Sequence, residues 1–390
     1  MPFTAALSTN PRSGRAIDEV CTRALESLQE KPDLAMLFFS TAHASNAEEI
    51  AGLANEKLHA SCLLGCSGEA IVGNDQEVEG NPAMSLWLGK WKQHVELEPF
   101  HLTLEETAEG VSILGWPDAL LTSDNAKSAL FLLGDPYTFP ADGFLQQVNE
   151  NHPQLRVMGG MASGARRNES CQLIYQDRVV DHGAIGVHLQ GAFKIRSIVS
   201  QGCRPIGQPM VVTKASENII EQLGGAAPME RLQQLWKELS PRDQQLFQQG
   251  LHIGRVINEY QESFQRGDFL IRNVLGLDRE TGSLAITDRA RVGQTVQFHV
   301  RDSESADDDL RTLLQMDTQA NQAAAGGALV FTCNGRGTRL FDEPHHDARA
   351  IRKEVGPIPL AGFFAQGELG PVGGQNFIHG FTASVVLFED

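Results

Sequence analysis

The sequence predicts an α/β fold, with mixed α+β as its variant, in two domains of repeated strand–helix–strand units. We expect mixed sheets flanked by helices. Two observations predict this class. A buried apolar strand, a helix, a short strand and a glycine-rich loop follow one another three times along the chain. The spacing from the first strand to the loop is also nearly constant. Alternation of this kind is typical of sheets covered by helices.

Each copy begins with an apolar run of strand length and ends in small residues. The first strands are expected at 34–39, 129–133 and 328–333, and the short strands at 62–64, 156–158 and 359–361. The helices between them are expected at about 47–58, 144–148 and 343–354. The loops are 65–69, 159–164 and 362–368.

A helical insert separates the second and third copies. Pro228 stands at a first helical position, and Ser240 before Pro241 is typical of a capped helix start. Strands are expected after these helices, at 269–277, 284–286 and 295–300. The stretch 202–209 is rich in glycine and proline, which favours a domain boundary there. We therefore predict a tail and helix at 1–29, a first domain at 30–205 and a second domain at 206–390.

The bulk composition excludes several classes of partner. The formal net charge is −17 at pH 7, and a surface of this sign repels both nucleic acid and anionic lipid. The longest apolar runs are of strand length, so no membrane insertion is expected. The six cysteines are spread thinly and no secretory leader is visible. Free thiols in a cytoplasmic protein are the expectation.

No motif indicates a cofactor, a metal or an established catalytic set. The loop 159–164 departs from the dinucleotide fingerprint, and neither a phosphate-binding loop nor a hydrolase elbow is present. His345 and His346 are adjacent and should point to different faces. Together with Asp347 they are expected to form a solvated helix start and not a metal site.

The glycine loops are the candidate ligand sites. A loop of small residues after a buried strand lets backbone N–H groups approach a carboxylate closely. The alternative is that each glycine serves only a tight turn. Charged groups beside the loops can orient an amino acid. The loop residues proposed to bind a ligand are Gly65, Cys66, Ser67, Gly68, Glu69, Gly159, Gly160, Gly362 and Glu368.

Cys333, Arg336 and Arg301 are further candidate ligand-binding residues. Cys333 should end an apolar strand, and Arg336 nearby would lower the pKa of its thiol. The alternative is a buried cysteine that acts as a small apolar residue. Arg301 follows a strand and is expected to be at least half-buried and paired with a carboxylate.

Several stretches, taken together and in order, resemble the FIST family. The C-terminal half is similar to the FIST C domain in GDFLIR (267–272), VQFHVRD (296–302), FTCNGRG (331–337) and PLAGFFAQGELGP (359–371). Asn376, His379 and Thr382 also fit. The N-terminal half is similar to the FIST N domain in LGCSGE (64–69) and VMGGMAS (157–163).

The resemblance implies a sensory module that binds a small ligand such as an amino acid and acts through a separate signalling partner. It adds Asn376 and His379 to the candidate ligand-binding residues and carries over no catalytic set. Two other functions stay open. One is a small-molecule enzyme with Cys333 as nucleophile. The other is a protein-interaction scaffold related to ubiquitin-ligase adaptors but lacking an F-box.

Overall fold

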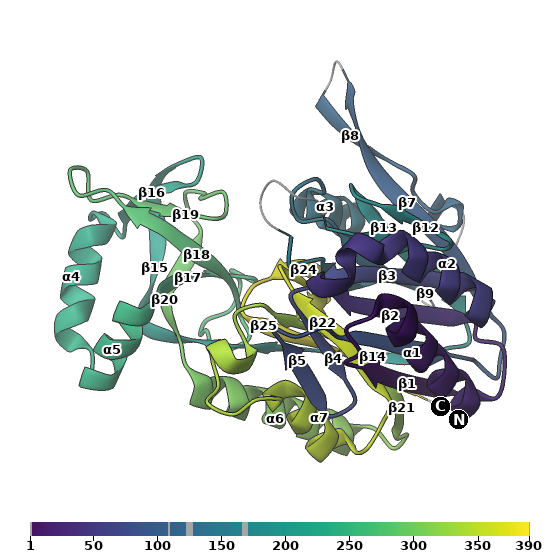
Figure 1. The fold of residues 1–390 in the computed structure, drawn as a ribbon. Coiled ribbons are helices and arrows are strands. Elements are labelled where there is room, and N and C mark those ends of the chain that lie inside the picture. The colour runs from purple at the N-terminus through teal and green to yellow at the C-terminus, as the bar shows by residue number, and fades with distance from the viewer. Residues whose placement is uncertain (1, 108–109, 122–127, 166–170, 390) are drawn as a thin grey trace. The chain divides into compact units, whose positions relative to one another are not determined.

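The computed structural model describes residues 2–107, 110–121, 128–165 and 171–389, which fold into two compact units. The first unit combines Met1–Val199 with Leu310–Asp390, and the second is Ser200–Asp309 (Figure 1). The chain therefore enters the second unit close to the boundary expected at residue 205. It returns to the first unit afterwards, so the stretch 206–390 is shared between the two units.

The three strand–helix–strand copies are confirmed, and in each the two strands are parallel neighbours. In the first copy β2 (Leu34–Ser40), α2 (Ala47–Leu58) and β3 (Cys62–Gly68) follow one another. In the second these are β9 (Ser128–Gly134), α3 (Ala141–Asn151) and β10 (Arg156–Met161). In the third they are β21 (Ala325–Cys333), α7 (His346–Val355) and β22 (Leu360–Ala365).

Antiparallel strands extend each pair on the same side, which makes the sheets mixed. β6 (Met84–Gly89) pairs with β2, β13 (Ala184–Gly191) with β9, and β25 (Thr382–Glu389) with β21. Beyond them lie β1 (Phe3–Ser8), β7 (Val95–Thr107) and β14 (Ile195–Gln201), and β8 (Gly110–Leu114) extends β7. The fold class is thus confirmed as mixed α+β.

The other side of each parallel pair carries a hairpin from a different copy. The hairpin after β3, formed by β4 (Ala70–Gly73) and β5 (Gln76–Glu79), pairs with β22. The hairpin after β10, formed by β11 (Leu173–Tyr175) and β12 (Arg178–Val180), pairs with β3. The hairpin after β22, formed by β23 (Glu368–Val372) and β24 (Gln375–His379), pairs with β10. This cyclic exchange ties the three copies together.

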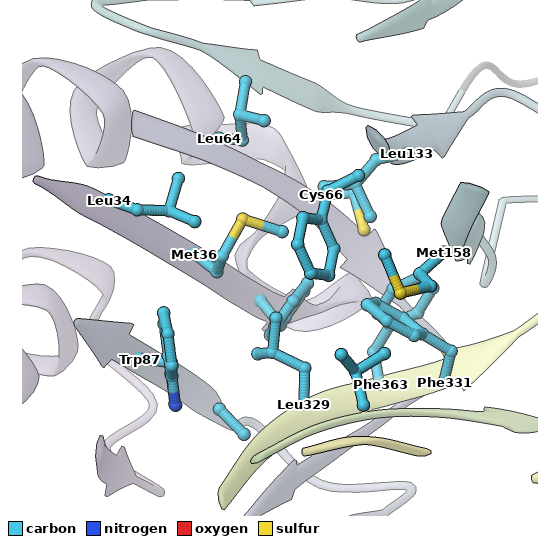
Figure 2. Close-up of a cluster of buried hydrophobic side chains, with 14 of the residues drawn as sticks. Leu34, Met36, Leu64, Cys66, Trp87, Leu133, Met158, Leu329, Phe331 and Phe363 are labelled. Carbon is cyan, nitrogen blue, oxygen red and sulfur yellow. The ribbon is translucent and has the colours of Figure 1, made fainter. Parts of the chain in front are cut away.

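The three sheets face one shared apolar core, and the helices cover their outer faces. Along β2, alternate side chains point to the two sides, as the two-residue period of a strand requires. Met36 and Phe38 enter the shared core with Phe131 of β9 and Phe331 of β21 (Figure 2 shows Met36 and Phe331). Side chains on the opposite faces pack against α1 (Ser13–Leu28) and α2, against α3, and against α6 (Ser303–Ala320) and α7.

The second unit contains a closed six-stranded barrel. Its strands, in order around the barrel, are β15 (Cys203–Ser216), β16 (Ile219–Leu223), β19 (Leu284–Ile286), β18 (Phe269–Leu277), β17 (Leu251–Val256) and β20 (Thr295–Arg301). The expected helices are present as α4 (Pro228–Glu238) and α5 (Pro241–Gln249). Ser240 caps α5, because its side chain accepts a hydrogen bond from the Asp243 N–H at 3.1 Å. Among the described residues, no helix combines the length and apolar character needed to cross a membrane.

Candidate functional site

The three glycine loops come together at the carboxyl ends of the parallel strands. The Glu69 N–H donates to Ser163 Oγ at 2.8 Å, and Ser163 Oγ donates to the Phe364 carbonyl. The Gln366 N–H donates to the Met161 carbonyl at 3.0 Å. The loops are therefore neighbours, as a shared site requires, but they bond directly to one another. A methyl group added at Gly68 would lie 2.9 Å from the Phe363 Cβ, so little space separates them.

Gly65, Gly159 and Gly362 occupy one equivalent position in the three copies. They pair with Leu37, Leu132 and Val330 of the neighbouring parallel strand. A Cβ atom at these glycines would lie 2.3, 1.9 and 1.8 Å from the carbonyl oxygens of those partners. Close strand packing alone thus requires glycine there. A Cβ atom added at Gly160 would lie 3.0 Å from the Ala365 Cβ.

A buried ion pair lies behind the end of β21. Arg336, whose exposure is 1%, donates two hydrogen bonds of 2.7 Å to Asp347 at the start of α7. Thr332 Oγ1 donates to the same carboxylate at 2.6 Å. Burial alone would raise the pKa of Asp347, but the charge of Arg336 and the hydrogen bonds of His346 and Arg336 hold it well below its usual range. The expectation of a solvated helix start at His345–Asp347 is therefore wrong for Asp347.

Glu77 and His346 complete this cluster. His346 stacks on the Phe341 ring at 3.4 Å, and its Nδ1 lies 2.9 Å from Asp347 Oδ1. Burial and the nearby Asp347 charge raise the pKa of Glu77 to about 8. Its Oε1 accepts from the Ala348 N–H at 2.8 Å. Sequence reasoning missed Glu77 because its partner Ala348 is remote in the chain.

Cys333 ends β21 as predicted, but its surroundings disfavour the thiolate. Burial and the neighbouring Glu368 carboxyl raise the pKa of the Cys333 thiol well above its ordinary value. Arg336 has only a minor opposing effect, because its guanidinium is engaged by Asp347. The prediction that Arg336 activates this thiol is therefore wrong in its net direction. The Gly335 N–H points at the sulfur, 3.4 Å away.

Glu368 is a fully buried carboxyl at the start of β23. Its Oε2 accepts hydrogen bonds from Thr382 Oγ1 at 2.7 Å and from the Thr382 N–H at 3.1 Å. Burial raises its pKa to about 8. Near neutral pH this carboxyl is largely protonated, so it does not present the carboxylate that an ammonium ligand would need. His379, which pairs with Glu368 across the hairpin, is buried with Nε2 2.9 Å from the Gly370 carbonyl.

Arg301 and Asn376 are two further predicted residues. Arg301 ends β20 in the second unit and is half-buried, as expected. Burial and, after it, the charge of Arg301 lower the pKa of His252 to about 4. Asn376 of β24 binds the Val157 N–H through Oδ1 at 2.8 Å and donates through Nδ2 to the Leu155 carbonyl at 2.8 Å. It thereby fixes the β23–β24 hairpin to β10.

A cavity in the first unit lies at the amino ends of the parallel strands β9 and β10. This cavity of about 1020 Å³ is bounded by the starts of β1, β9 and β10, by the turns after β6 and β13, and by the end of β25. Its floor belongs to the shared core, through Phe3, Trp91, Ala129 and Met158. We call it the amino-end cavity. Its lining comes from several distant turns, so no sequence motif could reveal it.

The mouth of the amino-end cavity is basic, although the chain is strongly acidic. Lys92, Arg156 and Lys194 line it, and Glu389 is the single carboxylate among the described lining residues. Glu389 already pairs with Arg196 at 2.7 Å and with Lys194 at 3.3 Å. Burial would raise the pKa of Glu389, but these cations lower it, so the group is ionised and occupied. A small anion would meet positive charge here.

The described residues include no group of three or more His, Cys, Asp or Glu side chains arranged to hold a metal ion. The described residues form two candidate sites. One is a closed cluster of buried acids around an arginine. The other is an open cavity with an apolar floor and a basic mouth.

The chain is similar to known proteins along its whole length. Residues 33–226 match the FIST N domain and residues 228–371 match the FIST C domain. The uncharacterized protein Mb0898c of Mycobacterium bovis is 40% identical over 391 residues, covering 100% of this chain and 99% of its own. The uncharacterized protein Rv0628c of Mycobacterium tuberculosis is also 40% identical over 391 residues, covering 100% of both chains. FIST domains are associated with sensory and signal-transduction roles. The chain belongs to the FIST family.

Proposed function

We propose that the protein is a sensory module that binds a small organic ligand in the amino-end cavity. The observation that carries this proposal is the cavity itself. Its volume of about 1020 Å³ is in the range of pockets that enclose small molecules. Its floor is made of buried apolar side chains and its mouth of charged ones. Ligand sites usually combine an apolar lining with a few polar groups that orient the ligand.

The position of the cavity suits a sensor. Elements of all three sheets line it, and the β23–β24 hairpin contributes Pro371 and Asn376. Asn376 is bonded to β10, while the other end of the same hairpin carries Glu368 beside Cys333. A ligand would thus contact strands from all three sheets at once, and its binding energy would stabilise their arrangement.

For the residues predicted at the glycine loops we propose a supporting role. Gly65, Gly159 and Gly362 allow the parallel strands to approach, and Ser163 joins the three loops. The raised pKa of the Cys333 thiol speaks against a nucleophile at this end.

A thermal-shift screen with a matched pair of variants tests the proposal. Ala192 is exposed in the turn after β13 and lines the cavity, so Ala192→Trp should fill the mouth without disturbing the core. Ala320→Trp, on an exposed position of α6 outside the lining, is the control. We expect some small molecules to raise the melting temperature of wild type and of the control but not of Ala192→Trp. A panel of acidic, neutral and basic compounds that shifts all three proteins alike, or none, would refute the cavity as the site.

A further inference from the structure

We infer that the ligand of the amino-end cavity is an organic acid with an apolar body and no ammonium group, such as a 2-keto acid or an aromatic carboxylate. This inference rests on the proposed function and narrows it. It also replaces the free amino acid that the family resemblance suggested. Three features of the cavity lead to it: the floor, the basic mouth and the single occupied carboxylate.

The floor selects an apolar body. Phe193 and Ile195 line the cavity and are only partly buried, so they offer apolar surface to a ligand. Behind them lie Phe3 and Met158, which are fully buried, and Trp91, which is 8% exposed. The Phe3 and Trp91 rings meet edge to face with centroids 6.0 Å apart. A polar group placed against these side chains would lose its water without gaining a hydrogen-bond partner. An aromatic ring or branched chain instead removes apolar surface from water, and aromatic pairs gain further from this geometry.

The mouth selects a carboxylate. Arg156 begins β10, and its Nη1 donates to the Ile195 carbonyl at 3.3 Å. No carboxylate pairs with Arg156 in the part of the chain that the structure describes. Its guanidinium can therefore offer two parallel N–H donors to a ligand carboxylate, the arrangement that arginine favours. Lys92 and Lys194 add positive charge from the flanking turns.

The same mouth disfavours an ammonium group. In an amino acid the ammonium and carboxylate share one carbon, so both would lie among the three cations. The only acid lining the described cavity is Glu389, which Arg196 and Lys194 already occupy. The ammonium would thus lie beside like charges, which is unfavourable. A keto or hydrogen substituent at that carbon avoids this.

Titrations with matched ligands decide the question. Phenylpyruvate and phenylalanine share one carbon skeleton and differ in the keto and ammonium groups, and phenylacetone lacks the carboxylate. With isothermal titration calorimetry we expect phenylpyruvate to bind at least roughly tenfold more tightly than phenylalanine, because of the like-charge penalty. Arg156→Gln should weaken the binding of phenylpyruvate by about threefold to tenfold and leave the affinity for phenylacetone unchanged. Arg156→Lys should restore part of the loss, and Arg289→Gln, an exposed arginine outside the lining, should have no effect.

The outcomes separate the two proposals. Phenylalanine that binds as tightly as phenylpyruvate, or phenylpyruvate that does not bind at all, overturns the ligand class. The proposed function survives that result if another compound is still blocked by Ala192→Trp. An Arg156→Gln protein that binds phenylpyruvate like wild type also overturns the inference, because the carboxylate would then lie elsewhere.

Discussion

Replacing Gly362 by alanine should destabilise the first unit severely, although the change adds only one methyl group. Gly362 lies in β22 opposite Val330 of β21, and its added Cβ would sit 1.8 Å from the Val330 carbonyl oxygen and 2.8 Å from the carbonyl carbon. Real Cβ atoms essentially never approach another heavy atom within 3.0 Å. The obstacle is backbone in a buried parallel pair, so no side-chain rotation can relieve it.

The structure sets the size of the effect. The two strands would have to separate locally by more than about 1 Å, which would lengthen ladder hydrogen bonds and loosen the core around Phe331 and Phe363. Overpacking of a core costs about 1–3 kcal/mol and occasionally more. For backbone against backbone we expect a loss of about 3 kcal/mol or more in the free energy of unfolding. Gly65→Ala and Gly159→Ala should behave similarly.

Urea unfolding followed by circular dichroism measures this directly. Gly52→Ala is the control, since Gly52 lies exposed in α2 with no heavy atom within 4 Å of its added Cβ. That change should stabilise the protein by about 0.5–1 kcal/mol through helix propensity. If Gly362→Ala were as stable as Gly52→Ala, the claim that glycine is required for strand packing would be refuted.

Three further predictions concern the buried cluster at the carboxyl ends. Asp347→Ala should lower the free energy of unfolding by about 3–5 kcal/mol, because it leaves the buried charge of Arg336 without its carboxylate partner. A denaturation curve that matches wild type would contradict this. The raised pKa of Glu368 means that the folded state holds its proton more tightly than the unfolded state. The contribution of Glu368 to stability should therefore fall as pH rises from about 4 to 8. Glu368→Gln should reduce that fall by a few kcal/mol. The measurement is the free energy of unfolding of both proteins across this pH range. The same slope against pH in both proteins would contradict the prediction. Cys333 of the native protein should react with iodoacetamide at pH 7.5 far more slowly than Cys333 of the protein unfolded in urea. Peptide mass spectrometry measures both rates, and equal rates would count against the raised thiol pKa.

The elements that sequence reasoning predicts well are those set by neighbouring residues. The run Leu34–Ser40, the helix Ala47–Leu58 and the strand from Cys62 need only local apolar pattern, and the same holds for the other two copies. The hairpin exchange is different, because Ala70–Gly73 pairs with Leu360–Ala365 across most of the chain. The local sequence of neither segment indicates which strand it pairs with. The closed barrel was missed for the same reason.

The site residues also include features that local sequence predicts and features that depend on the fold. Cys333 at a strand end followed from its apolar run, but its pKa depends on Glu368, which another strand supplies. Asp347 looked like a surface residue because its neighbours are polar, and only the fold brings Arg336 to it. The sequence predicts that the loop glycines contact a ligand or serve a tight turn. Their surroundings, however, favour strand packing over ligand contact.

The affinity of phenylpyruvate for wild type and for Ala192→Trp tests the central claim most directly. Isothermal titration calorimetry should show saturable binding of one molecule per wild-type chain, and binding at least roughly tenfold weaker in the variant, because the added ring occupies the mouth of the amino-end cavity. Binding of equal affinity to both proteins would contradict the account, since the ligand would then lie outside this cavity.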